Sequence, residues 1–107
     1  MAKINWDEKA EIVLDTYVEN AYHEFGAATA KKWLSEINTI EWRLERYPTS
    51  YPFEELLLGR NIQYRRCSMM NRRFRLIYYF DETDDVIHIV DIWDSRRNPT
   101  ALIKRIK

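Results

Sequence analysis

Two amphipathic segments separated by a single glycine, Gly26, are the feature that most restricts how this chain folds. Apolar and aromatic side chains recur every three or four residues on both sides of it, which is the spacing of a helix with one buried face. The pattern predicts helices over residues 7–25 and 27–47, with Asp7 as the first N-cap and Pro48 ending the second. Because almost nothing joins the helices, they are expected to form an antiparallel hairpin that covers another surface.

Three segments with the composition of β-strands follow the hairpin, over residues 62–69, 72–80 and 86–93. Residues 2–6 alternate weakly and suggest a short opening strand. Short connections make the three later strands antiparallel neighbours. Residues 48–61 are interpreted as a packed connection, and residues 100–107 as a helical turn or an extra strand. The chain of 107 residues therefore predicts one α+β domain over 1–107, in the order β-α-α-β-β-β, with the hairpin on one face of a mostly antiparallel four-stranded sheet.

Alternation along residues 72–80 sorts the side chains of the predicted middle strand onto two faces. Phe74, Leu76, Tyr78 and Phe80 point one way, and this set is expected to lie under the helices. The opposite set is expected on a face that is left partly open and carries the function: Arg73, Arg75, Ile77 and Tyr79. The residues expected to be buried together are Trp33, Leu34, Ile37, Leu76 and Tyr78.

The net charge is zero but unevenly distributed along the chain. Residues 1–58 carry 6 Lys/Arg and 11 Asp/Glu, a net of −5, whereas residues 59–107 carry 11 and 6, a net of +5. Such asymmetry indicates a basic patch that meets a polyanion or an acidic partner. The alternative interpretation is that the arginines simply cover the exposed face of a sheet.

Several kinds of chemistry are not indicated. A single cysteine, Cys67, and two isolated histidines do not supply a zinc site, and two glycines do not make a phosphate loop. We therefore expect no cofactor and no bound metal. No run approaches the roughly 20 apolar residues of a membrane span, so no membrane association and a cytoplasmic location are expected.

Three motifs in this order resemble the RelE/ParE toxin superfamily of type II toxin–antitoxin systems, which includes plasmid stabilisation proteins. They are YRRC at residues 64–67, FRLIYYF at 74–80 and VDIWDSRRNP at 90–99. The resemblance covers nearly the whole chain. It implies a growth-inhibiting toxin that a cognate antitoxin neutralises, and it leaves two kinds of target. RelE-like members are similar to ribosome-dependent endoribonucleases that cut mRNA, and ParE-like members are similar to inhibitors of DNA gyrase.

For a nuclease, the resemblance implies catalytic arginines at Arg66, Arg75 and Arg96 or Arg97. Cleavage also needs a general acid and base. RelE-like nucleases carry Tyr or His just beyond the last strand, and residues 98–102 contain neither. Tyr79 and Asp94 are weaker substitutes. We therefore favour a ParE-like toxin. The alternatives are a RelE-like mRNA endoribonuclease and a decayed member that only binds its antitoxin. Arg66 or Arg65, Arg75, and Arg96 or Arg97 are expected to form one basic patch.

Overall fold

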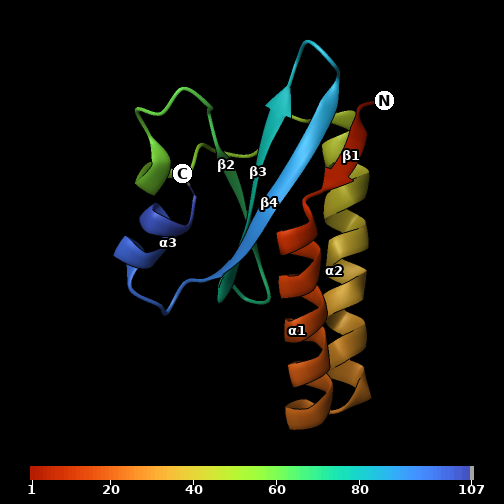
Figure 1. The fold of residues 1–107 in the computed structure, drawn as a ribbon. Helices are drawn as coiled ribbons and strands as arrows, with labels where there is room; N and C mark the ends of the chain where they lie inside the picture. Colours follow the sequence, from red (N-terminus) through yellow and green to blue (C-terminus); the bar gives the residue numbers. More distant parts are fainter. Residues whose placement is uncertain (107) are drawn as a thin grey trace.

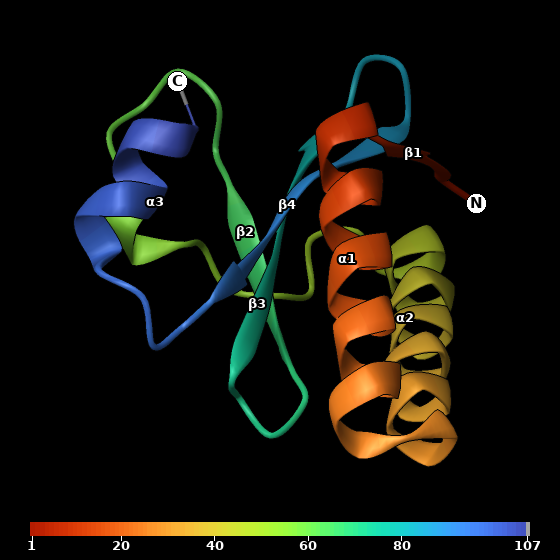
Figure 2. The ribbon, with the colours of Figure 1, turned by 60° about the horizontal axis from the view of Figure 1, so that its bottom comes forward.

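The chain folds into three layers, with a central sheet between a long helical hairpin and a smaller helical cover (Figures 1 and 2). The structure is a computed structural model and describes residues 1–106. The elements are β1 (Lys3–Trp6), α1 (Glu8–Phe25), α2 (Ala27–Arg46), η1 (Glu55–Leu57), β2 (Arg65–Met69), β3 (Phe74–Asp81), β4 (Val86–Asp94) and α3 (Pro99–Arg105).

The hairpin turns at Gly26, as its sequence predicts. This residue has φ +93°, a left-handed conformation that side chains with a Cβ rarely adopt, and its N–H donates to Tyr22 O at 2.9 Å. Helix α2 ends at Arg46, immediately before Tyr47 and Pro48. The predicted helices are therefore confirmed to within about one residue at each end.

The sheet has the strand order β1-β4-β3-β2. Strand β1 pairs parallel with β4, while β4 with β3 and β3 with β2 are antiparallel. The register between β3 and β4 shifts at Ile77/Tyr78, where β4 accommodates one extra residue, Val90. The predicted mostly antiparallel four-stranded sheet, with the hairpin on one face, is confirmed.

The main core lies between the hairpin and the sheet. Trp33, Ile37, Leu76 and Tyr78 are buried in it together, as predicted. The prediction for Leu34 was wrong, because 48% of its surface is exposed. Leu34 lies at the rim of the stripe by which α2 packs, so it faces solvent beside the buried residues of that helix: Ala30, Trp33, Ile37, Ile40 and Leu44.

A second, smaller core covers the other face of the sheet. The expectation of a partly open face there was wrong around Ile77 and Trp93, which are buried. Ile77 has no exposed surface. The cover comes from η1 and α3, which lie within segments interpreted from the sequence as a connection and a tail. Asn98 caps α3 by accepting from Thr100 N at 3.0 Å, and Pro99 occupies its first turn. The buried residues of this core are Leu57, Tyr64, Ile77, Trp93, Leu102 and Ile106.

Strand β2 is shorter than predicted, since it begins at Arg65 and not at Ile62. Around this start the chain also bonds to residues 52–54, through the bridge between Phe53 and Arg65. Glu54 N donates to Tyr64 O at 2.9 Å, and Arg66 N donates to Pro52 O at 3.0 Å. Over residues 1–106, no helix has both the length and the apolar character needed to cross a membrane.

Candidate functional site

The arginines singled out from the sequence do not all lie on one face of the sheet. Arg66 is paired with Ile77 across β2 and β3, and Arg75 is paired with Trp93 across β3 and β4. Paired residues point to the same face, so both arginines lie on the face that α3 covers. Arg65 is paired with Tyr78 and belongs to the hairpin face.

Arg75 forms an ion pair with a fully buried carboxylate. Its Nη1 lies 3.0 Å from Glu54 Oε1 and 3.1 Å from Oε2, and Glu54 has no exposed surface. Glu54 Oε1 also accepts from Leu56 N at 3.3 Å and so caps η1. The Arg75 side chain is about one-third exposed, but its charge is balanced by Glu54 inside the protein.

Arg66 and Arg96 also have partners within the chain. Arg66 Nη1 donates to Phe53 O at 2.8 Å, and Arg96 Nε lies 3.5 Å from Asp94 Oδ1. Partial burial tends to raise the pKa of Asp94, but hydrogen bonds from the Arg96 amide and guanidinium, with the charges of Arg96 and Arg73, lower it. Asp94 therefore stays ionised and is a weak proton acceptor near neutral pH.

Arg97 contacts Trp93, the cross-strand neighbour of Arg75. Its guanidinium carbon lies 4.9 Å from the centre of the Trp93 ring, and that of Arg105 lies 5.5 Å from the same ring. Arg75 and Arg97 thus approach Trp93 on one face, whereas Arg96 turns to Asp94. The residues brought together on this face are Arg66, Arg75, Arg97 and Arg105.

Tyr79 lies apart from Arg75. It is four residues beyond Arg75 on β3, about 13 Å along the strand at ~3.3 Å per residue. Its ring stacks on His88 at 4.7 Å and meets Tyr64 edge-on at 5.7 Å. Burial, and then the negative charge of Asp7, raises the pKa of Tyr79. Tyr79 is therefore not placed to exchange a proton with a group bound at Arg75.

Two arginines that were not singled out from the sequence, Arg60 and Arg105, hold helix α3 against the rest of the protein. Arg105 Nη2 lies 2.8 Å from Asp91 Oδ1, and Asp91 is only 1% exposed. Burial raises the pKa of Asp91, and the charge of Arg105 opposes this shift. Arg60 donates to the carbonyls of Ile103 and Ile106 near the end of the helix.

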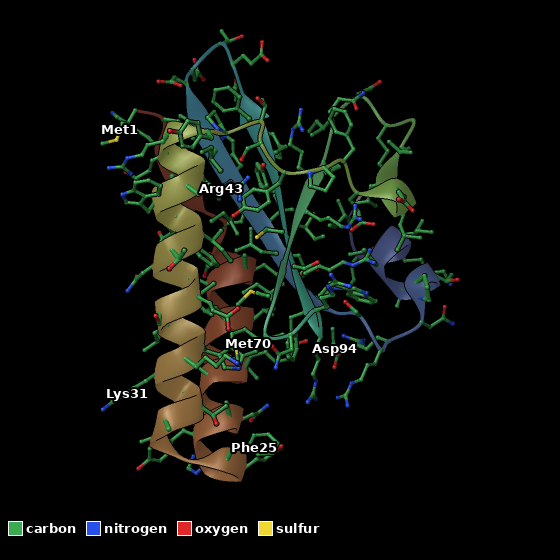
Figure 3. The ribbon with its side chains drawn as sticks, turned by 180° about the vertical axis from the view of Figure 1, so that it is seen from behind. Met1, Phe25, Lys31, Arg43, Met70 and Asp94 are labelled. Atoms are coloured by element: carbon green, nitrogen blue, oxygen red, sulfur yellow. The ribbon has the colours of Figure 1, made fainter. Side chains whose placement is uncertain are left out.

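A groove of about 380 Å³ opens between the far end of the hairpin and the β2–β3 turn. We call it the distal groove. Figure 3 places Met70 and Asp94 at this end of the sheet, with Phe25 at the tip of the hairpin. Rings of Tyr17, Trp33 and Phe74 pack within 4.7–5.6 Å of one another at its base. Its lining is Tyr17, Asn20, Ala21, Glu24, Phe25, Thr29, Trp33, Met70, Asn71, Arg73, Phe74 and Asp94.

The turn beside the distal groove has an unusual backbone. Met70, Asn71 and Arg72 have φ values of +51°, +57° and +67°, so three successive residues with side chains are left-handed. Helix α2 supports this turn, because Glu36 Oε1 accepts from Met70 N at 2.9 Å. Strain of this kind is often found at binding sites.

One protein family matches the chain over residues 4–99, and its description is "ParE toxin of type II toxin-antitoxin system, parDE". The chain belongs to this family. It is therefore the toxin component of a type II toxin–antitoxin system, as the sequence resemblance predicted. No curated protein sequence matches the chain significantly.

Solved structures share the fold of this ParE-family toxin. A chain of the chromosomal ParDE system from P. aeruginosa is similar with a TM-score of 0.69 and 18% identity, over 88% of this chain and 96% of that one. A metal-bound toxin from Helicobacter pylori has a TM-score of 0.62 and 18% identity, over 90% and 97%. The isolated E. coli RelE toxin has a TM-score of 0.58 and 14% identity, over the full length of both.

Three features of this ParE-family site were missed from the sequence: Glu54, the Asp91–Arg105 pair and the distal groove. A single signal was available for Asp91, a lone acid in the otherwise apolar run Ile89–Trp93. Such a residue in a buried strand needs a partner. Nothing local distinguishes Glu54 from Glu55, because only the tertiary contacts decide which one is buried.

Proposed function

We propose that this toxin inhibits growth in a ParE-like manner, without cutting RNA, and that its target is DNA gyrase. The observation that carries the proposal is the Arg75–Glu54 pair. A nuclease arginine must be free to stabilise charge that develops on the scissile phosphate. Here the Arg75 guanidinium lies 3.0 Å from the buried carboxylate of Glu54, which neutralises the positive charge of the arginine in the resting protein.

The region after β4 supports the same conclusion. Asn98 and Thr100 form the N-cap of α3, and the helix covers the second core with Leu102. This stretch therefore has a structural role and presents no tyrosine or histidine. Asp94 is held ionised by Arg96, and Tyr79 lies about 13 Å along the strand from Arg75. No described residue beside Arg75 is thus suited to act as general acid.

Two assays on the purified chain test the proposal. We expect inhibition of DNA supercoiling by gyrase, with accumulation of cleaved DNA, and no new mRNA 5′ ends in a translating extract mapped by primer extension. Ribosome-dependent mRNA cuts would establish the RelE-like alternative and refute the proposal. Absence of both activities in a chain that still binds its antitoxin would identify the decayed member and refute it equally.

The antitoxin partner follows from the type II system, and we propose that an amphipathic segment of it binds in the distal groove. The apolar base between charged rims suits a helix that folds on binding. Phe25 is 63% exposed, so Phe25→Ala should leave folding unchanged and weaken antitoxin binding in calorimetry. Ile12, 58% exposed on the same helix but outside the groove, supplies the control Ile12→Ala. Equal effects of the two changes would rule out this placement.

A further inference from the structure

Arginines and aromatic rings lie together along a surface that the candidate site does not include. It runs from the end of α2 through the segment after it to the start of β2, and Figure 3 shows that segment leaving the top of α2, with Arg43 labelled on the helix. We define this arginine–aromatic surface by the following residues: Trp42, Arg43, Arg46, Tyr47, Tyr51, Phe53 and Arg65.

Three guanidinium groups on this surface lie over aromatic rings. Arg46 lies 4.2 Å from the ring centre of Trp42, Arg43 lies 4.5 Å from that of Tyr51, and Arg65 lies 4.1 Å from that of Phe53. A cation–π contact holds a cation in place without neutralising it. The three arginines are thus fixed as charged groups in one region.

Hydrogen bonds to neutral acceptors hold the same groups. Arg43 Nε donates to Ser50 Oγ at 3.1 Å, and Arg46 Nη1 donates to Trp42 O at 2.9 Å. Arg65 Nη1 donates to Thr49 O at 3.1 Å and to Tyr51 O at 2.6 Å. Within residues 1–106, none of these arginines forms an ion pair. Their charges therefore remain uncompensated by the protein, in contrast to those of Arg75, Arg96 and Arg105.

The rings contribute exposed area as well as support. Trp42 is 54% exposed, Tyr47 is 57% exposed and Phe53 is 40% exposed. Between Trp42 and Phe53 the chain has a single acidic residue, Glu45, which is half-buried. Large rings left in water beside fixed cations indicate a binding surface more than a stabilising one.

We propose that the arginine–aromatic surface binds single-stranded nucleic acid, with the arginines along the phosphate backbone and the exposed rings stacked on bases. Fixed, uncompensated cations attract phosphates without regard to sequence. Stacking of a base on an exposed ring adds affinity with little dependence on sequence, because every base has a face to stack. An acidic protein segment would use the cations but would leave most of the aromatic area without a specific role, so nucleic acid fits both features.

The test is fluorescence anisotropy with a labelled mixed-sequence 20-nucleotide strand, as DNA and as RNA, titrated with the full chain. We expect the double variant Arg43→Gln/Arg46→Gln to bind at least about tenfold more weakly at low salt. The slope of log affinity against log salt should become shallower by about 1.4, or ~0.7 per lost phosphate contact. Trp42→Leu should weaken binding without changing this slope.

The matched control is Lys31→Gln/Lys32→Gln, which removes the same charge from exposed positions at the other end of α2. Thermal unfolding of each variant checks that the fold is retained. The proposal is overturned if the control weakens binding as much, or if the wild-type chain does not bind at low salt. It is also overturned if poly-glutamate of equal length competes as well as the strand, since the partner would then be an acidic protein. Gyrase and translation assays do not enter this test, so it fails or succeeds independently of the proposed function.

Discussion

Arg75 Nη1 lies within 3.0 and 3.1 Å of the two carboxylate oxygens of Glu54, and Glu54 is completely buried. These residues are 21 positions apart, on β3 and immediately before η1. The pair joins the sheet to the segment that covers its second face. Because of this pair, a substitution of Arg75 is expected to lower the stability of the fold, whatever its effect on binding to a target.

Removal of Arg75 should therefore destabilise the chain. Arg75→Ala leaves the Glu54 carboxylate buried without its partner, which typically costs about 3–5 kcal/mol; partial exposure of Arg75 places the effect near 3 kcal/mol. Urea denaturation measures this value. The double variant Glu54→Gln/Arg75→Gln should lose less, because no unpaired charge remains. A fully stable Arg75→Ala variant would show that the pair contributes nothing to the fold.

Two leucines of α2 should respond differently to truncation. Leu44 has no exposed surface and Leu34 is 48% exposed. Leu44→Ala should cost about 2–5 kcal/mol through lost burial and a cavity, whereas Leu34→Ala should cost less than about 1 kcal/mol. Denaturant midpoints of the two variants give the comparison. Equal losses would contradict the orientation of α2 on the sheet.

The strained β2–β3 turn offers a stabilising change. Arg72 has φ +67° and is exposed, so Arg72→Gly should relieve a left-handed conformation and raise stability by about 0.5–1 kcal/mol after the entropic cost of glycine. The melting temperature measures the gain. Arg73→Gly is the matched control, because Arg73 is outside the left-handed region, and it should give no gain.

Asp91 should make stability depend on pH in an identifiable direction. Burial raises the pKa of Asp91 above its ordinary value of 3.8, against the charge of Arg105. The folded state then binds this proton more tightly than the unfolded state. The stabilisation that comes from protonation of Asp91 in the folded state is complete below pH 3.8. It is lost as the pH rises through the pKa of Asp91 in the folded state.

The variant Asp91→Asn cannot titrate at this position and isolates the effect. Its amide oxygen still accepts from Arg105, so the contact is kept in part. Urea denaturation of both proteins from pH 3 to 7 should show the wild-type stability falling relative to that of the variant as pH rises. A constant difference across this range would mean that Asp91 has the same pKa in both states.

The hairpin, the strands and the main core could be predicted from the sequence because their signals are local. Periods of 3.6 and 2 residues assign Trp33, Ile37, Leu76 and Tyr78 to one buried surface, and Gly26 marks the turn. The family resemblance was also carried by such local motifs. At the edge of the buried face of α2, however, periodicity did not distinguish the exposed Leu34 from its buried neighbours Trp33 and Ile37.

The tertiary structure alone decided which side chains the arginines meet. Three arginines form ion pairs: Arg75 with Glu54, Arg105 with Asp91, and Arg96 with Asp94. Two more lie over aromatic rings: Arg43 over Tyr51, and Arg65 over Phe53. A long guanidinium side chain reaches several acceptors equally well, so its sequence neighbours do not determine its partner. The choice follows from η1, α3 and the segment after α2, which are too short or too irregular to give a periodic signal in the sequence.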